Sequence, residues 1–449
     1  MSERIVIIGN GISGITCARH LRKNNASCEI IVISGETDYF FSRTALMYIY
    51  MGHMKFEHTK PYEDWFWTKN RIQLKRVWVT KINTDQNELV FDDATTLNYH
   101  KLIIASGSTS NKFGWPGQNL AGVQGLYSYQ DLQLMEQNTQ NIKNAVIVGG
   151  GLIGVEMAEM LHSRGIHVTF LIREHTFWGN VLPKADGDFI STHLKNDYCI
   201  NLKFNTQLQS IIDDGSGKVK AVITNNGEEI NCEFVGLAVG VSPNVEFLKS
   251  SAIEVDKGVL INNRFETNIP HVFAIGDCAQ FKSPPKGRKP IEQGWYTGRM
   301  MGELLAKNLT TNNSTAYQPG PWFNSAKFFD VEYQTYGEVK PNLPEHEQAF
   351  IWQDLENRRM LHFRFNTVDE VLIGVNAFGI RLRHEVFDAW LRQQKTIDEV
   401  LTKLADANFD PEFYKTFEQE VIGEYNKQFG KNLKLKTKSW KRILNPFSA

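Results

Sequence analysis

A run of four apolar residues near the start of the chain leads into a glycine-rich turn and then into a pattern typical of a helix. The run is Ile5 to Ile8, and the turn holds Gly9, Gly11 and Gly14. An apolar run of this length predicts a buried strand, and a Gly-x-Gly-x-x-Gly spacing between strand and helix is typical of dinucleotide binding. The first glycine permits the tight turn, the second leaves room for a pyrophosphate, and the third lets the helix pack closely on the strand. We therefore expect a dinucleotide at the N-terminus of this helix, where unpaired N–H groups and the helix dipole favour phosphate.

The same pattern returns later in the chain. The apolar run Ala145 to Val148 leads into a turn with Gly149, Gly151 and Gly154, and a helical pattern follows. Two such units are far more specific than one. Because strand, phosphate-binding turn and helix repeat, we expect an α/β fold with two Rossmann-like domains and two bound dinucleotides.

Charged residues follow the second strand of each unit, where the adenosine ribose of a dinucleotide is usually bound. In the first unit Glu36 is the candidate ribose ligand, and Asp38 is its competitor. In the second unit Arg173 suits the 2′-phosphate of NADPH, whereas the adjacent Glu174 could serve a ribose hydroxyl. This pattern favours NADPH slightly over NADH.

Later segments extend the first unit. The strand Arg76 to Ile82 belongs to a predicted β-hairpin insertion, and Leu97 to Ile104 returns to the parallel sheet. An apolar strand ending at Gly276 and Asp277 places a carboxylate at the carboxyl end of a sheet, where open α/β sheets bind ligands. A helix is expected to begin near Glu292.

The C-terminal third contains three segments with different sequence patterns. Gly320 to about Ala377 alternates as strands do, and Arg381 to Asn426 has Leu, Phe and Val at helical spacing. The end of the chain is basic, with lysines at positions 427, 431, 434, 436, 438 and 441 and an arginine at 442. This tail could dock an acidic electron-carrier protein or an anionic membrane surface, or it could be a solvated or locally packed terminus.

Length and charge limit the alternatives. A chain of 449 residues with a net charge of −1 suggests two or three domains and provides no global field for nucleic acid. The first predicted strand begins so early that no signal peptide precedes it, and no apolar run approaches membrane-spanning length. We expect a cytoplasmic protein without a transmembrane segment; peripheral binding to a membrane through the tail is the alternative.

The cysteines are widely spaced. Cys17, Cys28, Cys199, Cys232 and Cys278 form no Cys-x-x-Cys or other close pair. This spacing argues against a disulfide framework, a zinc site and a short-range redox dithiol.

The motifs together resemble those of the FAD-dependent pyridine nucleotide oxidoreductases, flavoproteins that bind two dinucleotides, over about residues 3 to 340. The matching segments are the first glycine turn, Leu102 to Gly107, the second turn with Glu156, Gly240 to Asn244 and Thr267 to Asp277. The resemblance implies three domains: an FAD-binding domain of residues 1–118 and 246–319, an NAD(P)-binding domain of residues 119–245, and a C-terminal α+β interface domain of residues 320–449 with a helical extension and basic tail. In this family the last domain covers the flavin and often forms a homodimer. Trp322 or Phe323 could make the contact with the flavin here, or both could pack in the core of that domain.

The same resemblance assigns cofactor roles. The first turn and Glu36 would hold the ADP part of FAD, and Asp277 would bind its ribityl and pyrophosphate region. The other residues implied in FAD binding are Arg43, Val79, Ala105, Gly107, Gly276, Glu292 and Gln293. The residues implied in NAD(P)H binding are Gly149, Gly151, Gly154, Arg173, Glu174 and Gly240. The helix after Glu292 would point its N-terminus at the flavin and stabilise negative charge on its reduced form.

Departures from the family pattern indicate the subclass. Arg43 stands where NADH oxidases and coenzyme A disulfide reductases of this family carry a single cysteine, and an arginine here is similar to the ferredoxin reductases and the flavoprotein part of nitrite reductases. Those reductases continue Pro-Pro-Leu-Ser-Lys, whereas this chain continues from Thr44 to Tyr48 without a lysine. The usual lysine–glutamate arrangement is therefore missing, and Arg43 and Glu156 are the candidate catalytic residues.

The resemblance implies an enzyme that transfers hydride from NAD(P)H to FAD and passes the electrons to an external acceptor, without a cysteine relay. A ferredoxin- or rubredoxin-type protein or a small molecule is the expected acceptor. Two alternatives are a type II NADH:quinone oxidoreductase-like enzyme that uses the basic tail at a membrane, and an apoptosis-inducing-factor-like flavoprotein that senses nucleotides.

Overall fold

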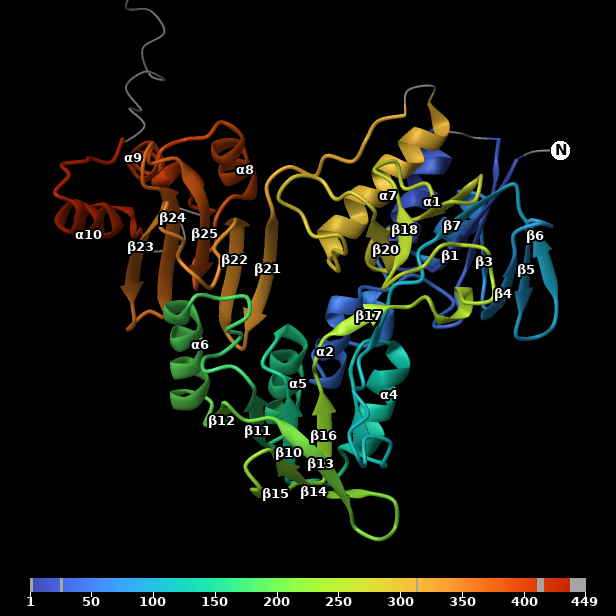
Figure 1. The fold of residues 1–449 in the computed structure, drawn as a ribbon, viewed down its shortest axis with the longest axis horizontal. Helices are drawn as coiled ribbons and strands as arrows, with labels where there is room; N and C mark the ends of the chain where they lie inside the picture. The colour runs from blue at the N-terminus through green and yellow to red at the C-terminus, as the bar shows by residue number, and fades with distance from the viewer. Residues whose placement is uncertain (1–2, 25–26, 312–313, 410–415, 437–449) are drawn as a thin grey trace, which may run out of the picture. The chain divides into compact units, whose positions relative to one another are not determined.

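The computed structural model describes residues 3–24, 27–311, 314–409 and 416–436. Its chain divides into two compact units, residues 1–175 with 198–319, and residues 176–197 with 320–449 (Figure 1). This division differs from the predicted domain boundaries at residues 176–197, which group with the C-terminal unit instead of the NAD(P)-binding domain. No helix in the described ranges is long and apolar enough to cross a membrane.

The first unit contains two five-stranded sheets, and every strand pair in both is parallel. The order of the first sheet is β19 (Val272–Ala274), β7 (Lys101–Ile104), β1 (Arg4–Ile8), β2 (Glu29–Ile33) and β3 (Ile72–Lys75). The order of the second is β12 (Asn201–Phe204), β11 (His167–Ile172), β10 (Asn144–Val148), β16 (Phe234–Leu237) and β9 (Val123–Gln124). The α/β fold class is confirmed, with β1 and β10, the strands before the two glycine turns, inside their sheets.

As the two motifs predicted, α1 (Ile12–Asn24) follows β1 and α5 (Leu152–Ser163) follows β10. The other α-helices in the described part of this unit are α2 (Leu46–Tyr50), α3 (Asp64–Lys69), α4 (Tyr129–Asn138) and α7 (Trp295–Thr310). Helix α7 was expected to begin near Glu292 but begins at Trp295, because Gly294 is its extended N-cap residue. Helices α1 and α7 pack closely together beside the first sheet (Figure 1).

Small sheets complete the first unit. The predicted hairpin insertion is the antiparallel sheet β4 (Val79–Asn83), β5 (Glu88–Phe91) and β6 (Thr96–Asn98). A second antiparallel sheet is β13 (Leu208–Asp213), β14 (Val219–Thr224) and β15 (Glu229–Asn231). Two strand pairs join distant segments, β8 (Ser108–Ser110) with β17 (Val241–Pro243), and β18 (Val259–Ile261) with β20 (Ala279–Phe281).

The second unit is built on one antiparallel sheet with helices on both faces. Its order is β21 (Phe323–Phe328), β22 (Val331–Gly337), β25 (Leu372–Phe378), β24 (Arg359–Asn366) and β23 (Glu347–Asp354). One face is apolar and packs against α8 (His384–Arg392), α9 (Ile397–Thr402) and α10 (Glu418–Phe429). Because alternate residues of a strand point to opposite faces, the residues between these apolar ones lie on the opposite face of the sheet.

Helix α6 (Lys184–Asn196) covers that second face. Phe189 packs against Phe378 at 5.6 Å between ring centroids. At the start of the helix the buried carboxylate of Asp186 pairs with His362 and accepts a hydrogen bond of 2.7 Å from Asn376. These contacts explain why residues 176–197 belong to the C-terminal unit.

Candidate functional site

The first glycine turn lies between β1 and α1. Gly9 has a φ of +111°, and a Cβ there would lie 2.1 Å from the carbonyl oxygen of Ala105; a Cβ at Gly14 would lie 2.1 Å from the oxygen of Gly9. At Gly11, by contrast, a Cβ would meet no protein atom within 4 Å. The protein's own packing therefore explains Gly9 and Gly14 but not Gly11, whose open surroundings fit the close approach of a pyrophosphate.

The second turn repeats this geometry between β10 and α5. Gly149 has a φ of +102°, and a Cβ there would lie 2.4 Å from the oxygen of Ala238. A Cβ at Gly154 would lie 2.3 Å from the oxygen of Gly149, while Gly151 is the N-cap of α5. The first turns of α1 and α5 contain no acidic residue. Both helix N-termini therefore fit an anionic ligand.

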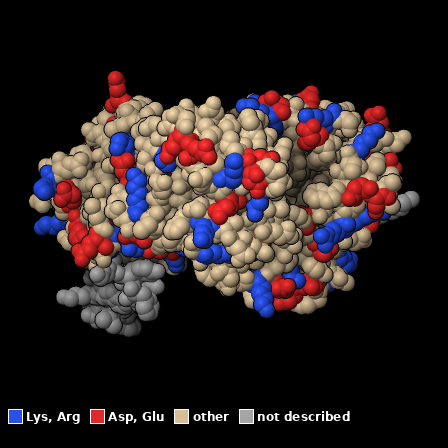
Figure 2. Space-filling view, turned by 90° about the horizontal axis from the view of Figure 1, so that it is seen from below, with Lys and Arg blue, Asp and Glu red and all other residues tan. Residues whose placement is uncertain are grey.

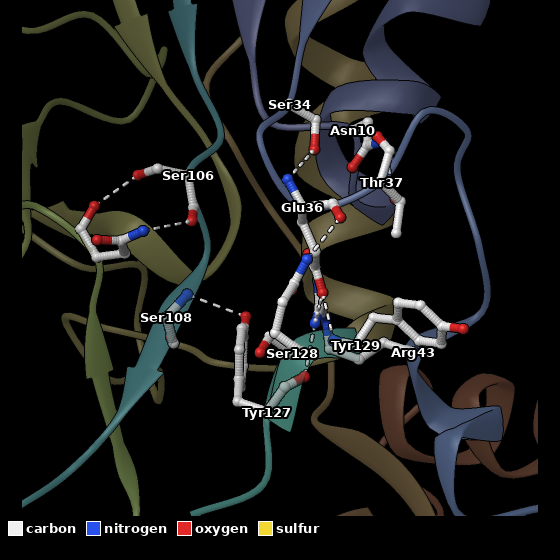
Figure 3. Close-up of polar contacts among 12 residues, drawn as sticks. Asn10, Ser34, Glu36, Thr37, Arg43, Ser106, Ser108, Tyr127, Ser128 and Tyr129 are labelled. Atoms are coloured by element: carbon white, nitrogen blue, oxygen red, sulfur yellow. Dashed lines mark hydrogen bonds and ion pairs between the residues drawn. The ribbon is translucent and has the colours of Figure 1, made fainter. Parts of the chain in front are cut away.

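The carboxylate of Glu36 is held at the carboxyl end of β2 (Figure 3). Its side chain is 14% exposed and forms a forked pair with Arg43, with hydrogen bonds of 2.8 and 2.6 Å. The backbone N–H of Tyr129 adds a third hydrogen bond of 2.9 Å, to the oxygen that already accepts the longer of these. Since a carboxylate has about four acceptor positions, Oε2 retains one for a ribose hydroxyl.

Asp38, the competitor for this role, is more exposed and pairs with Arg76 at 3.1 Å. Glu36 is therefore the better placed of the two candidates. The local fold explains the difference, because Ser34 and Gln130 also hydrogen-bond the backbone of Glu36 and fix this residue near the first turn.

The predicted FAD site at the first glycine turn has a second carboxylate, that of Asp277, which follows β19. Its Oδ2 lies 3.4 Å from both the Ser108 hydroxyl and the Tyr127 phenol. Burial raises the pKa of Asp277, and the positive charge of Arg43 acts in the opposite direction. The backbone N–H of Gly294, at the start of α7, also lowers the pKa. The start of α7 therefore lies beside this carboxylate.

Other predicted cofactor residues gather around Asp277. Ala105 and Gly107 follow β7, with Gly107 at a φ of +72° beside the Tyr127 hydroxyl. Gln293 donates to the Ser108 hydroxyl at 2.9 Å and to the oxygen of Val241 at 3.2 Å. Gly276, with a φ of +75°, lies beside Ser13 of α1.

Three predicted residues have other surroundings. Glu292 is buried and forms an ion pair with Arg288, so its carboxylate holds the loop before α7. Val79 begins β4 in the antiparallel insertion, and Gly240 precedes β17, where its carbonyl oxygen accepts a hydrogen bond from the backbone N–H of Asn111.

The residues predicted for the nicotinamide nucleotide lie at the second turn. Arg173 and Glu174 follow β11 and form an ion pair of 2.9 Å, with the Arg173 side chain 68% exposed. Glu156 lies on α5, and burial together with the nearby Glu159 raises the pKa of Glu156 to about 7. No hydrogen bond or ion pair of this carboxylate is found among the described residues, which fits the missing lysine.

A raised pKa makes the stability effect of Glu156 depend on pH. The folded state favours the protonated form, so stability is lost as the pH rises from the ordinary glutamate pKa through 7. Glu156→Gln should therefore be more stable than the parent protein by about 1–3 kcal/mol at pH 8, with a smaller gain at pH 5. Urea unfolding at both pH values measures this, with the exposed Glu57→Gln as the control. A gain that is the same at both pH values would contradict the raised pKa of this half-buried, unpaired carboxylate.

None of the cysteines forms a disulfide. Cys278 follows Asp277, but its sulfur faces the carbonyl oxygens of Ile104 and Ile275, and burial raises its pKa. Cys199 alone is exposed. The thiol next to the first site is therefore a buried packing group in a state that disfavours the reactive thiolate.

Sequence reasoning missed Tyr127, Ser108 and the N-terminus of α4. Tyr127 accepts a hydrogen bond of 2.9 Å from the backbone N–H of Ser108, and its ring lies under the guanidinium of Arg43, 4.5 Å from the centroid. Tyr127 follows a two-residue strand and carries no motif. A local pattern gave no signal for it, because its position depends on contacts with β8 and with the loop after β2.

Comparison with known proteins agrees with this geometry. Residues 3–302 match the pyridine nucleotide-disulphide oxidoreductase family. The assimilatory nitrate reductase electron transfer subunit of Bacillus subtilis is 26% identical over 397 residues, which cover 87% of this chain and only 50% of that protein. Rhodocoxin reductase of Rhodococcus erythropolis is 27% identical over 332 residues, covering 72% of this chain and 76% of the relative.

A solved structure shows the same fold. The ferredoxin reductase for the CYP199A2 system from Rhodopseudomonas palustris superposes with a TM-score of 0.77 at 21% identity, over 84% of this chain and 91% of its own. The family match spans the two parallel sheets, both glycine turns and Asp277. On this ground the predicted family is confirmed, and the chain belongs to the pyridine nucleotide-disulphide oxidoreductases.

Proposed function

We propose that this protein is an FAD-dependent NAD(P)H oxidoreductase that passes electrons to an external acceptor without a cysteine relay. The observation that carries the proposal is the pair of glycine turns, where Gly11 leaves space that no protein atom uses and both helix N-termini lack acidic residues. FAD would supply the hydride acceptor and release the electrons onward. The chain itself would bind and orient the two nucleotides, through Glu36 and Asp277 at the first site and Arg173 or Glu174 at the second.

The relatives favour a redox protein as the acceptor, since one is named rhodocoxin reductase and the structural neighbour is a ferredoxin reductase. The state of the cysteines supports direct transfer from the flavin, because Cys278, which follows Asp277 in the chain, is buried with its sulfur against carbonyl oxygens. The acceptor is either a ferredoxin-type protein or a small molecule. Comparing the rates with several candidate acceptors distinguishes the two.

The basic tail was predicted as a docking element for an acidic partner or a membrane. Its first part is packed: Lys431 pairs with Glu370 and Asp398, and Leu433 and Leu435 contact the core of the C-terminal unit. Lys434 and Lys436 are exposed, and residues 437–449, which include the basic positions 438, 441 and 442, lie outside the described residues. On the face that Figure 2 draws, acidic and basic side chains are interspersed, without a large region of one sign. Electrostatic docking of an acidic carrier therefore remains a proposal for the last residues of the tail.

Anaerobic reduction tests the proposal directly. The purified protein should be yellow, and NADPH or NADH should bleach its flavin absorbance; mixing with ferredoxin, rubredoxin, quinone, disulfide or oxygen should then restore the absorbance with one acceptor class much faster than with the others. A folded protein that cannot be loaded with FAD would refute the assignment. Reduction of disulfides that disappears when all five cysteines are replaced by serine would refute direct transfer.

Coenzyme preference should depend on Arg173. Because its guanidinium is exposed beyond β11, Arg173→Glu would add repulsion against a 2′-phosphate and supply an acceptor for a ribose hydroxyl. We expect kcat/KM for NADPH to fall at least about tenfold more than kcat/KM for NADH. Lys220→Glu on β14 introduces the same charge change elsewhere on the unit and should affect both coenzymes equally. Equal losses in Arg173→Glu would mean that this side chain does not contact the 2′ position.

A further inference from the structure

Tyr127 contacts Asp277 through its side chain and contacts Arg43, the partner of Glu36, through its backbone. Figure 3 shows Tyr127 with Ser108, Arg43 and Glu36. The phenol of Tyr127 lies 3.4 Å from Asp277 Oδ2. The carbonyl oxygen of Tyr127 accepts a hydrogen bond of 2.6 Å from Arg43, and that guanidinium pairs with Glu36. Tyr127 therefore contacts Asp277, which is predicted to bind the ribityl region, and also Arg43, which holds the predicted ribose ligand Glu36.

The direction of the hydrogen bonds at the Tyr127 phenol follows from which of the groups around it can donate a proton. The backbone N–H of Ser108 donates to the phenol oxygen of Tyr127 at 2.9 Å, and an N–H has no acceptor function. The phenol proton is consequently available for Asp277, whose carboxylate, when it is ionised, only accepts hydrogen bonds. Burial raises the pKa of Tyr127, so the phenol keeps this proton and remains a donor.

We propose that Tyr127 is a positioning residue of the flavin site, which keeps Asp277 ionised and Arg43 on Glu36 and thereby sets the pH range in which FAD binds. The inference rests on the proposed function, because it concerns the same site. The charged and titratable groups that face Asp277 are Arg43, Tyr127 and Cys278, and Glu36 acts on Tyr127 across Arg43.

The physical reason is a balance at Asp277. Burial favours the neutral acid, whereas Arg43, the Tyr127 phenol, the Ser108 hydroxyl and the backbone N–H of Gly294 favour the carboxylate. Without the phenol one of these four is lost, and the carboxyl takes up a proton at a higher pH than in the parent protein. A neutral Asp277 is a weaker acceptor for the hydroxyl groups of a bound ribityl chain, because hydrogen bonds to ionised acceptors are roughly twice as strong.

The test is the pH dependence of FAD binding by Tyr127→Phe, which removes the hydroxyl and keeps the ring under Arg43. The apoprotein is titrated with FAD from pH 5.5 to 8.5 and the dissociation constant is measured by flavin fluorescence. Relative to the parent protein, we expect Kd to rise at the acid end of this range, by at most about tenfold for a pKa change of about one unit, and the ratio of the two Kd values to fall towards one at pH 8.5. Tyr50→Phe is the matched control: it loses a buried hydroxyl contact of 2.6 Å with Thr139 in the same unit and should leave the ratio near one throughout.

Two further variants separate this role from simple packing. In an Asp277→Asn background, which cannot ionise, Tyr127→Phe should change Kd by the same factor at every pH. If Tyr127→Phe does not fold, Tyr127→3-fluorotyrosine retains the shape and makes a stronger donor, so it should shift the binding profile to lower pH. A parent apoprotein that binds no FAD would refute the proposed function itself. A parent that binds FAD, with a Tyr127→Phe ratio that is constant with pH, would leave that function intact and overturn the role of Tyr127.

Discussion

Gly11→Ala should leave the apoprotein folded but weaken FAD binding at least about a hundredfold, whereas Gly14→Ala should destabilise the fold itself by about 2–4 kcal/mol. The difference comes from the surroundings of the added methyl group. At Gly11 it meets no protein atom within 4 Å, so it would extend into the space in which a pyrophosphate approaches the backbone. At Gly14 it would lie 2.1 Å from the oxygen of Gly9, and the contact of α1 with β1 would have to open.

Two measurements distinguish these outcomes. Urea unfolding of the apoproteins gives the stability, where Gly11→Ala should differ from the parent by less than about 1 kcal/mol, since Gly11 immediately precedes α1. FAD titration gives the affinity. A Gly11→Ala protein that binds FAD as tightly as the parent would show that the first turn does not contact the pyrophosphate. Equal loss of stability in both variants would show that Gly11 serves packing alone.

The second large effect concerns the buried ion pair before α7. Arg288 and Glu292 have side chains only 4% and 3% exposed, and the guanidinium donates two hydrogen bonds to the carboxylate. Arg288→Ala should cost about 3–5 kcal/mol, because it leaves an ionised carboxylate buried without its partner. The double variant Arg288→Met with Glu292→Met should recover most of this loss, since neither charge then remains to be desolvated.

The chain provides a matched comparison for this pair. Arg299 and Glu303 on α7 have the same types and spacing, with side chains 54% and 38% exposed. Arg299→Ala should change the free energy of unfolding by less than about 0.5 kcal/mol, as for other exposed pairs. Similar losses at Arg288 and Arg299 would contradict the role of burial. Because the loop of Arg288 leads into Gln293 and Gly294 beside Asp277, the Arg288→Ala variant should also retain FAD less well.

The sequence was sufficient for the parts of the fold that depend on local spacing. The two glycine turns, the strands before them and the carboxylate after β19 are determined by residues next to each other in the chain, and the structure has them where the spacing predicted. Glu36 could be named for the same reason, as it follows β2 directly. The choice between Glu36 and Asp38 needed the structure, because it depends on Arg43 and on the N-terminus of α4.

The remaining features depend on residues far apart in the sequence. Tyr127 has no motif of its own, and its contacts with Ser108 and Asp277 arise only when β8 and β19 are in place. Helix α7 begins three residues after Glu292 because Gly294 is extended, and the buried pairing of Glu292 with Arg288 could not be seen from helical periodicity. The packed part of the basic tail was hidden in the same way, since Lys431 pairs with acids from two earlier segments.

The position of α6 has a consequence for synthesis on the ribosome. Residues 176–197 are made before residues 198–319, yet their partners in the sheet of the C-terminal unit are made afterwards. Until those strands emerge, Asp186 and Phe189 have neither His362 nor Phe378 to contact. The nascent chain must therefore keep this amphipathic helix unpaired while the first unit is being completed. Ribosome release before residue 378 would leave it exposed, so chaperone binding to stalled chains should concentrate on this segment.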